Sequence, residues 1–597
     1  MAVLRYLSLF NTLALKNLFL GPLAAAVLLL WQPSAAQTRW MDPMQAGFPV
    51  VQGQGWNDEL GGTYGRLPGR VRDGVRPALW GLSAHSAGLA LHFVTNSPSV
   101  QVRYTVSAPT AMEHMPATGV SGADLYSVDP DGTWRYLSRA FAWRGDTVSY
   151  AFRPVAGDRY AELGWEYRLY LPLYARVGKL EIGVDSSARF AWIPQRTERP
   201  VVAYGTSILQ GGCASRPGMA WTNILSRRLD RTVMNFGFSG NGQMDPELLA
   251  LIGEIPARIY LVDCLPNLEY ADDSLFRRKY IDGIRLLRLK SDAPILLVEH
   301  AGGTQNFANA AAAHKNRLLR ECYEQLRAAG VRELYYLDAD EIALPADGTV
   351  DGIHPTDLGM QFIAEAYERK IRDILREPAG TGSTTRAAVQ RREAAGYDWY
   401  ARHDDILERN RLSLPRVAMI GNSITHYWGG TGGKYPENGR GAWEKTMAPA
   451  GFRNMGCGND RIENMLWRIY HGELDGYAAE RVVLLAGVNN LLKGDSDRLI
   501  VDGILRLAEA VRDRQPEASI EVIGLLPCNG QQERIAGLNA QLDEALRAQG
   551  IASFRDVGAP LLQKRTGRIE GGLFLDGLHP SEKGYQKIAG TIADPGR

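Results

Sequence analysis

The sequence predicts a multidomain protein in which an all-β, jelly-roll-like sandwich precedes two α/β domains with parallel sheets. Three observations lead to this prediction. Short segments that alternate or are rich in β-branched and aromatic residues fill the first third of the chain. Short apolar strands then alternate with helical stretches, and this α/β series restarts near residue 397. At 597 residues the chain is also too long for one hydrophobic core.

Residues 1–36 are predicted to be a secretory signal. Arg5 and Lys16 are positive, residues 17–31 are mostly apolar, and small residues at 34–36 offer a cleavage site. The apolar run is shorter than the roughly 18 residues that a membrane span needs. No cysteine follows it to carry a lipid anchor. We therefore expect cleavage after Ala36, secretion across the inner membrane into the periplasm, and no membrane span in the mature protein.

Composition excludes some classes of partner and scaffold. A hydrophobic content of 45% and a charged content of 22% are ordinary for a soluble globular protein. The formal net charge of +1 gives no electrostatic reason to expect nucleic acid as a partner. Five cysteines are few for an exported chain, so the fold does not depend on a disulfide framework. Their number is odd, so at least one thiol stays free.

The expected β domain covers residues 37–195. Gly, Pro and Asp clusters separate its strands, and no amphipathic helix is apparent between them. Packing two antiparallel sheets face to face buries such strands, which favours a sandwich. The strands are expected at residues 89–94, 100–106, 147–152, 167–171 and 180–184.

The first α/β domain is expected at residues 196–377 and the second at residues 397–597. Residues 378–396, which begin with a Pro-, Gly-, Ser- and Thr-rich stretch, are predicted to be a linker. Apolar residues at helical spacing between 358 and 375 predict the last helix of the first domain. Its strands are expected at 201–204, 233–236, 259–262, 295–298 and 334–337. After a charged helical segment at 397–411, those of the second domain are expected at 417–420, 452–455, 482–485, 520–523 and 551–555.

A repeated pentapeptide, Asp-Gly-x-His-Pro, stands at residues 351–355 and again at 576–580. In each copy it follows the last strand and precedes the last helix. Far upstream, a Gly-x-Ser-Ile sequence follows the first strand, with Ser207 in one copy and Ser423 in the other. Because the carboxyl ends of parallel strands meet at one edge of a sheet, we expect the serine and the histidine to meet there.

These residue types predict nucleophilic catalysis on an ester. A neutral imidazole takes the serine proton, and the carboxylate orients the imidazole and stabilises its charged form. This chemistry needs no cofactor or metal, and the sequence contains no convincing metal-ligand spacing or phosphate-binding glycine loop. The candidate catalytic residues are Ser207, Asp351 and His354 in the first copy and Ser423, Asp576 and His579 in the second.

An acyl-transfer site also needs donors for the developing oxyanion. Loops after the second and third strands of each α/β series offer them. In the first copy we expect a backbone N–H at Gly240 and the side-chain amide of Asn267. In the second copy the corresponding residues are Asn459 and Asn489.

Each α/β series contains, in the same order, the Gly-x-Ser sequence, the two loops with oxyanion donors and the Asp-Gly-x-His-Pro pentapeptide. In this order the four sequences resemble the SGNH (GDSL-type) hydrolase family across residues 196–377 and 397–597. The resemblance implies a flavodoxin-like α/β fold. It also implies that the Ser, Gly, Asn and His after which the family is named are, in the first copy, Ser207, Gly240, Asn267 and His354, with Asp351 as the acid. Ser423, Asn489, His579 and Asp576 carry over in the same way to the second copy.

The second copy departs from the family pattern at Asn459, where the family has glycine. A main-chain N–H is still available there, and asparagine tolerates left-handed backbone better than most residues. Its side chain would narrow the acyl pocket. The second copy is therefore either a working site or a degenerate copy kept for packing or binding.

Gly-Ala-Asp-Leu-Tyr at residues 122–126 resembles the Gly-x-Asp-Leu-Tyr signature of a β domain that precedes some bacterial SGNH esterases. Together the resemblances imply an exported serine esterase that removes O-acetyl groups from plant polysaccharide or glycan fragments. An acetylated carbohydrate is then the expected partner. The alternatives are hydrolysis of another short-chain ester, such as a lipid acetyl group, and a glycan-binding scaffold with degenerate α/β domains. No oligomeric state is predicted.

Three further interpretations stay open at this level. His300 either lines the first pocket or is a structural or surface residue. His426 and Trp428 face the second cleft or belong to an exposed loop. Cys213 and Cys264 follow neighbouring strands, and either form a disulfide between the nucleophile loop and the oxyanion loop or remain separate buried thiols.

Overall fold

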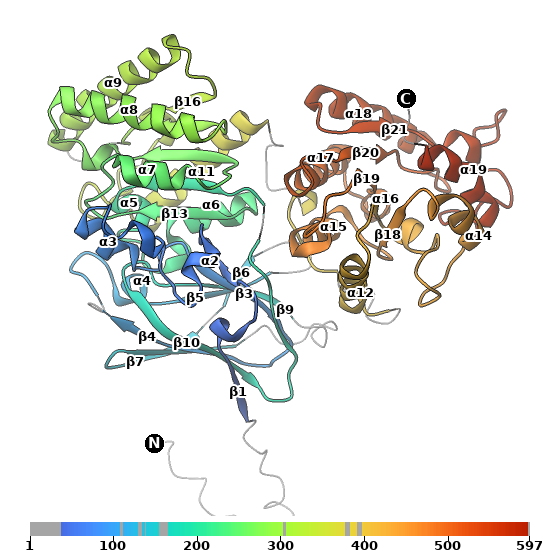
Figure 1. Ribbon diagram of the computed structural model, residues 1–597, viewed down its shortest axis with the longest axis horizontal. Coiled ribbons are helices and arrows are strands. Elements are labelled where there is room, and N and C mark those ends of the chain that lie inside the picture. The colour runs from blue at the N-terminus through green and yellow to red at the C-terminus, as the bar shows by residue number, and fades with distance from the viewer. Residues whose placement is uncertain are drawn as a thin grey trace, which may run out of the picture.

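The computed structural model of the chain describes residues 37–107, 111–128, 134–137, 139–153, 165–196, 198–301, 306–376, 383–390 and 397–594. The predicted signal at residues 1–36 lies outside them. The described chain forms a β domain and two α/β domains, which confirms the predicted fold class. Figure 1 shows the first α/β domain against the β domain and the second α/β domain beside both.

The β domain is a sandwich of two antiparallel sheets, ordered β1-β10-β4-β8-β7 and β11-β3-β9-β5-β6, with β2 paired to β3. Its core takes apolar residues from both sheets, such as Phe93 and Leu169 from one and Val102 and Ile182 from the other. The strands are β1 (Thr38–Met41), β2 (Val51–Gln52), β3 (Ala90–Thr95), β4 (Val100–Ser107), β5 (Asp124–Val128), β6 (Trp134–Tyr136), β7 (Arg139–Arg144), β8 (Thr147–Phe152), β9 (Trp165–Tyr170), β10 (Arg176–Asp185) and β11 (Phe190–Trp192).

All five strands expected in this domain are present, but short helices also occur where none was apparent. They are α2 (Asn57–Leu60), α3 (Pro77–Ser83) and α4 (Ala117–Val120). A helix of one or two turns is too short to show a 3.6-residue period in sequence. The structure also adds β5, which begins at the Asp of the Gly-x-Asp-Leu-Tyr signature and lies between β9 and β6 in its sheet.

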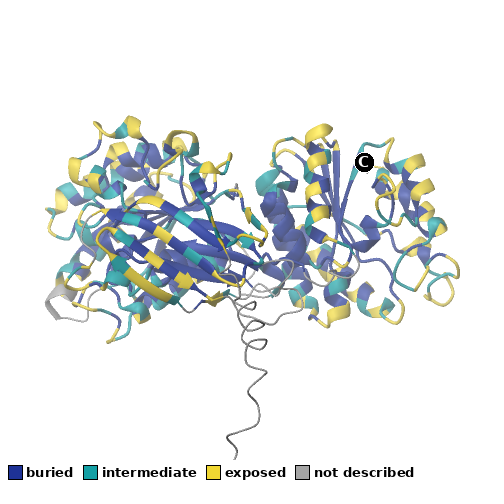
Figure 2. Cartoon of the chain, turned by 90° about the horizontal axis from the view of Figure 1, so that it is seen from below, coloured by how far each residue is buried: buried dark blue, intermediate teal, exposed yellow. Residues whose placement is uncertain are grey.

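The first α/β domain has a five-stranded parallel sheet, ordered β13-β12-β14-β15-β16. Its strands lie as predicted and are nearly all buried. Figure 2 shows the same burial, in dark blue, for the parallel strands of the second α/β domain on the right of the view. They are β12 (Val201–Gly205), β13 (Val233–Gly237), β14 (Ile259–Asp263), β15 (Ile295–Val298) and β16 (Leu334–Leu337). The main helices are α5 (Ser207–Gln210), α6 (Trp221–Leu229), α7 (Pro246–Ile252), α8 (Asp273–Lys290), α9 (Asn306–Ala328), α10 (Ala339–Ile342) and α11 (Asp357–Leu375).

The second α/β domain repeats this arrangement with the sheet order β18-β17-β19-β20-β21. Its strands are β17 (Val417–Gly421), β18 (Phe452–Gly456), β19 (Arg481–Leu485), β20 (Ser519–Ile523) and β21 (Ser553–Arg555). Its helices include α12 (Trp399–Leu412), α13 (Ser423–His426), α15 (Ile462–Arg468), α16 (Val488–Lys493), α17 (Asp497–Arg514), α18 (Gln532–Gln549) and α19 (Glu582–Ala593). In both domains the first strand lies between the second and the third, so the loops that follow these three strands lie side by side at the carboxyl edge.

The signature in β5 joins the β domain to the first α/β domain. The fully buried carboxylate of Asp124 accepts hydrogen bonds from the backbone N–H of Gly218 and from the guanidinium of Arg216, both at 2.8 Å. Arg216 also donates to the hydroxyl of Tyr126 at 2.8 Å. The Asp and Tyr of the signature therefore hold the segment that leads into α6, and the motif has a docking role.

The second α/β domain contacts both other domains through polar groups, most of which are buried. The Asp513 carboxylate pairs with Arg199 at 2.6 Å and with Arg231 at 3.2 Å. The indole N–H of Trp467 donates to Glu166 of the β domain at 2.7 Å. Such contacts fix the placement of the second domain, because a buried charge without its partner is costly.

The predicted linker, residues 378–396, lies partly outside the described residues. Its described part, 383–390, is largely buried instead of running free. Thr384 donates to the carbonyl of Leu499 at 2.6 Å, and the N–H of Ala387 donates to Asp230 at 2.7 Å. Gln390 donates to the carbonyl of Gly458 at 2.7 Å. The content of Pro, Gly and Ser predicts a break in regular structure. The hydrogen bonds to both α/β domains, which the composition does not predict, hold this connection between them.

None of the helices in the described ranges has the length and apolar character to cross a bilayer.

Candidate active sites

The nucleophile candidates lie at equivalent places in the two sheets. Ser207 is the first residue of α5, directly after β12, and Ser423 is the first residue of α13, directly after β17. The residue before each serine caps its helix: Thr206 accepts from the N–H of Ile208, and Asn422 accepts from the N–H of Ile424. A short helix that begins on a side-chain cap turns the chain sharply, which presents the serine hydroxyl at the edge of the sheet.

The repeated pentapeptide brings its histidine to this serine in both domains. In the first, Ser207 Oγ lies 2.8 Å from His354 Nε2, and His354 Nδ1 lies 2.7 Å from Asp351 Oδ2. In the second, Ser423 Oγ lies 2.8 Å from His579 Nε2, and His579 Nδ1 lies 2.6 Å from Asp576 Oδ2. The six predicted residues therefore form two separate Ser–His–Asp arrangements with the same connectivity.

Local backbone geometry holds each Asp–His pair. The other carboxylate oxygen of Asp351 accepts from the N–H groups of Ile353 and His354 at 3.0 and 2.7 Å. Asp576 does the same for Leu578 and His579 at 3.0 and 2.8 Å. The glycine between them has a positive φ in both copies, 87° and 81°, which the tight turn requires. The aspartate thus orients both the loop and the imidazole.

These hydrogen bonds also keep the two carboxylates ionised. Burial raises the pKa of Asp351, but hydrogen bonds from the backbone and imidazole of His354 outweigh it and lower the pKa overall. The same balance lowers the pKa of Asp576 to about 2. A charged carboxylate accepts the Nδ1–H of neutral imidazole and leaves Nε2 without its proton, ready to take one from serine.

The loop after the second strand has the same backbone conformation in both copies. Gly240 has φ 68° and Asn459 has φ 57°, and both are exposed at the mouth of the site. A Cβ added at Gly240 would meet nothing within 4 Å. Asparagine at this place is therefore accommodated without a clash, which removes one structural reason to regard the second copy as degenerate.

The two oxyanion asparagines are oriented differently. Asn267 accepts from the N–H of Gly242 at 3.0 Å through its amide oxygen, which leaves the amide NH₂ for a ligand. Asn489 donates from its amide nitrogen to the carbonyl of Asp460 at 2.8 Å, which leaves one N–H of the NH₂ group. Both amides border the predicted loop of their own domain.

A buried arginine beneath each oxyanion loop was not predicted. Arg66, from the β domain, donates to the carbonyls of Asn235 and Gly237 at 3.0 and 2.7 Å. Arg402, from α12, donates to the carbonyls of Asn454 and Gly456 at 2.9 and 3.1 Å. The two arginines come from unrelated segments with no shared motif, so no sequence signal pointed to them.

The residue three positions after the nucleophile also supports the oxyanion loop. Gln210 accepts from the N–H of Ser239 at 3.0 Å, and His426 accepts from the N–H of Gly458 at 3.0 Å. His426 is fully buried, and burial lowers its pKa to about 2, so it acts as a neutral acceptor. It occupies neither the cleft nor an exposed loop, the two positions that the sequence left open.

Two other aromatic candidates are buried. Trp428 is buried and stacks on Tyr585 with ring centroids 4.6 Å apart, so it does not face the second cleft. His300 is buried, and burial, with a smaller effect of His354, lowers its pKa to about 4. Its backbone is fixed by Asn316, which accepts from the His300 N–H at 3.0 Å.

The five cysteines, all in described segments, are free and buried. Cys213 and Cys264 are thus separate thiols in this structure, the second of the two readings of the sequence. Cys264 donates to the carbonyl of Tyr204 at 3.6 Å. Cys213 instead lies beside His354 and His114. Burial raises the pKa of the Cys213 thiol to about 12, so it is no alternative nucleophile.

An open parallel sheet with a Ser–His–Asp arrangement and nearby N–H donors at its carboxyl edge defines the class of this protein, a carboxylic ester hydrolase. Comparison with known proteins then gives the family. The model of the GDSL-like lipase/acylhydrolase family matches residues 198–372, and a second model of that family matches residues 419–587. A model of the N-terminus of SGNH-hydrolase-type esterases matches residues 38–190. The chain belongs to the GDSL-like lipase/acylhydrolase family.

Several known proteins are similar to parts of this chain. A solved protein from Bacteroides ovatus, described as a GDSL-like lipase, is 30% identical with a TM-score of 0.52, over 57% of this chain and 98% of its own. Subunit alpha1 of human platelet-activating factor acetylhydrolase IB is 28% identical over 198 residues, which are 32% of this chain and 80% of that subunit. A family 2 carbohydrate esterase from Clostridium thermocellum shares 13% identity and a TM-score of 0.35, over 48% and 92% of the two chains.

Proposed function

We propose that both α/β domains hydrolyse short acyl esters, acetyl esters above all, through an acyl-enzyme on Ser207 and on Ser423. The observation that carries the proposal is the double Ser–His–Asp geometry, with a Ser–His distance of 2.8 Å in each domain. Histidine takes the serine proton as Oγ attacks the acyl carbonyl, and later returns it to the departing alkoxide. Water then attacks the acyl-enzyme with the same histidine as the base, and the histidine gives the proton from water to serine Oγ as the carboxylic acid departs.

Charge on the carbonyl oxygen is stabilised by groups that are already in place. In the first domain these are the backbone N–H at Gly240 and the amide of Asn267, and in the second the N–H at Asn459 and the amide of Asn489. The loops that carry them are held by Arg66 and Gln210 in one domain and by Arg402 and His426 in the other. Donors fixed before the reaction need no reorganisation in the transition state.

For the substrate we propose O-acetyl groups on carbohydrate, such as plant polysaccharide or glycan fragments, hydrolysed in the periplasm after export. The carbohydrate part of the proposal rests on the resemblance of the β domain to that of bacterial SGNH esterases, and the match of this domain to the N-terminus of SGNH-hydrolase-type esterases supports an ester substrate. The named activity of the 28% identical relative, an acetylhydrolase, supports the acetyl group and favours a lipid acetyl ester as the second candidate. A pure glycan-binding scaffold is disfavoured by two complete Ser–His–Asp arrangements.

Release of acetate decides between these functions. The full chain, Ser207→Ala and Ser423→Ala are each incubated with acetylated xylan, with an acetylated oligosaccharide and with an acetyl phospholipid. We expect acetate from the carbohydrates, with each variant retaining the activity of its intact domain. Faster release of acetate from the phospholipid would establish hydrolysis of a lipid acetyl ester instead. If no substrate released acetate, a glycan-binding scaffold would remain as the function. N-terminal sequencing of protein recovered from the periplasm tests export.

A further inference from the structure

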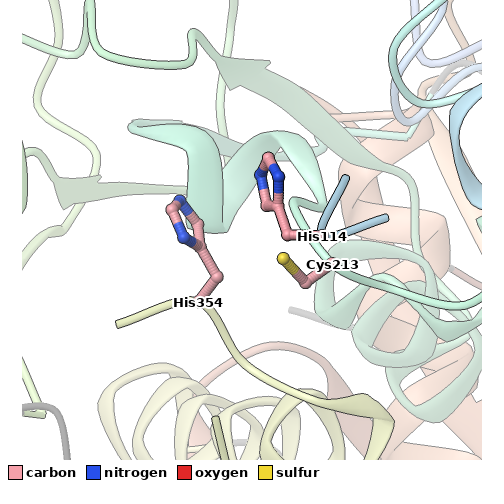
Figure 3. A group of neighbouring side chains, drawn as sticks. All are labelled: His114, Cys213 and His354. Atoms are coloured by element: carbon pink, nitrogen blue, oxygen red, sulfur yellow. The ribbon is translucent and has the colours of Figure 1, made fainter. Parts of the chain in front are cut away.

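Two side chains that the proposed chemistry does not use lie beside the histidine of the first site. His114, Cys213 and His354 each offer a ligand atom, and these atoms all lie within 4.8 Å of one another. The rings of His114 and His354 are 5.6 Å apart. Figure 3 shows the three side chains converging from separate segments, with the Cys213 sulfur directed toward the space between the two rings.

The backbone of each contributing segment is held in place. His114 stands in a tight turn in which Met112 and Met115 exchange N–H···O hydrogen bonds of 3.0 and 3.1 Å. That turn leads into α4, where Thr118 donates to the carbonyl of Ser215 at 2.7 Å and so connects to the segment of Cys213. The β domain thereby delivers the imidazole of His114, whereas Cys213 and His354 come from the first α/β domain.

The donor set fits one metal ion. Two imidazole nitrogens and one thiolate are the ligands that Zn²⁺ prefers, and three protein ligands leave its fourth tetrahedral position to water. Metal coordination deprotonates a thiol outright. Nδ1 of His354 already bonds Asp351, and a carboxylate on the far nitrogen is the usual support of a zinc-binding histidine. The Asp–His pair that presents a base to serine therefore also presents a ligand to zinc.

We propose that His114, Cys213 and His354 form a zinc site that shuts off the first active centre when it is occupied. The inhibition rests on the proposed function, whereas zinc binding does not. Zinc would take the Nε2 lone pair that now faces Ser207, so the serine proton would have no acceptor. Zinc is thus a reversible inhibitor of this domain.

The second active centre provides an internal control. The ring next to His579 is that of Tyr427, with centroids 5.9 Å apart, and the described part of the chain contains no second group of this kind. Zinc at concentrations that fill the first site therefore leaves the second active. One chain would then carry a zinc-sensitive and a zinc-insensitive copy of the same chemistry.

Direct binding tests the site without any substrate. The full chain, stripped of metal, is titrated with Zn²⁺ by calorimetry and with Co²⁺ by absorption spectroscopy. We expect one equivalent of tight zinc and a near-ultraviolet thiolate-to-cobalt band. His114→Ala and Cys213→Ser should weaken zinc binding by more than the roughly 10- to 100-fold that loss of an outer-shell partner costs. His114 is exposed, so its removal spares the fold.

Matched controls replace residues of the same type elsewhere in the first α/β domain. His314→Ala removes an exposed imidazole paired with Asp273, and Cys322→Ser removes a buried thiol. Both should bind zinc like the parent. In activity assays, zinc should inhibit Ser423→Ala, whose first site is intact, and not Ser207→Ala. Inhibition of Ser423→Ala should disappear when His114→Ala is added.

The outcomes separate the two proposals. Absence of stoichiometric zinc binding, or binding unchanged by His114→Ala and Cys213→Ser, overturns the zinc site whatever the enzyme does. Equal inhibition of both single-serine variants overturns the selective switch. If no substrate is hydrolysed by any form, the proposed function fails, and the calorimetric and cobalt titrations still decide the metal site.

Discussion

Asn459 in the second α/β domain has the same left-handed backbone as Gly240 in the first, with φ 57° against 68°. A Cβ at Gly240 would meet nothing within 4 Å, and asparagine tolerates left-handed backbone better than most residues, so there is space for either residue in this loop. What differs is a side chain at the mouth of the second site. The consequence should appear in the length of the acyl group accepted and not in the fold.

Exchanging these residues should exchange acyl preference. Gly240→Asn, made in Ser423→Ala, should keep acetyl ester hydrolysis and lower butyryl ester hydrolysis by roughly tenfold, because a pocket narrowed by one side chain excludes added methylenes. Asn459→Gly, made in Ser207→Ala, should do the reverse. The ratio of kcat/KM for acetyl and butyryl p-nitrophenyl esters is the measurement. An unchanged ratio in both variants would contradict a role of this position in acyl selection.

Loss of both serines should abolish ester hydrolysis. Ser207→Ala and Ser423→Ala should each lower kcat of their own site by roughly four to six orders of magnitude. Oxyanion stabilisation should leave some residual activity. The double variant should retain the circular dichroism spectrum and melting temperature of the parent. Turnover by the double variant above one part in a thousand of the parent would place the chemistry elsewhere.

Arg66 should act as a positioning residue for the first oxyanion loop. Arg66→Met removes the donors to the carbonyls of Asn235 and Gly237, and each unsatisfied buried carbonyl costs about 1–3 kcal/mol. We expect kcat of the first site to fall by roughly tenfold or more with little change in KM, since the oxyanion donors act mainly in the transition state.

The matched change is Arg402→Met, which should affect the second site alone. Arg66→Met is assayed together with Ser423→Ala, and Arg402→Met together with Ser207→Ala, so that only the affected site is active. The stability of each variant is measured by unfolding in parallel. Lysine can donate to only some of the carbonyls that Arg66 binds, so Arg66→Lys should have a higher kcat than Arg66→Met but a lower one than the parent. A fall in stability with unchanged kcat would make the arginine purely structural.

The contact of the second α/β domain should weaken in acid. Burial opposes ionisation of Asp513, but the charges of Arg231 and Arg199 outweigh it and hold its pKa at about 2. A carboxyl with a lowered pKa in the folded state contributes stability above its unfolded pKa of about 3.9, and this contribution is lost as pH falls toward 2. The contribution is about 2 kcal/mol.

Asp513→Asn tests this contact. The free energy of unfolding of the parent should exceed that of the variant at pH 7, and the difference should shrink between about pH 4 and pH 2. Asp543→Asn, at a partly exposed carboxylate paired within α18, is the control and should show little effect at any pH. A parent–variant difference that is constant with pH would contradict the proposed charge contact.

The rate of ester hydrolysis should rise with pH on the acid side. The pKa of Asp351 is lowered and that of Asp576 is about 2, so both carboxylates stay ionised above about pH 4. The rise therefore reports loss of the proton from the imidazolium of the catalytic histidine, because only neutral imidazole accepts the serine proton. The pH dependence of kcat/KM in each single-serine variant measures it. A rate independent of pH from about 5 to 8 would argue against a histidine base.

Much of the fold was predictable because its signals are local. Every predicted strand of the two α/β domains is present, since apolar runs bounded by turns report burial directly. The repeated Asp-Gly-x-His-Pro also determines its own loop, because Asp351 bonds the backbone and ring of a residue three positions away. Chain order along a parallel sheet was enough to expect Ser207 and His354 to meet.

Only the tertiary structure could reveal contacts between segments that share no pattern. Arg66 and Arg402 reach equivalent carbonyls from a β-domain segment and from a helix, and His426 is a buried acceptor and not a cleft residue. The approach of His114 to Cys213 depends on how the β domain docks. Such placements are decided by the packing of surfaces distant in sequence, and a sequence read residue by residue carries no record of that geometry.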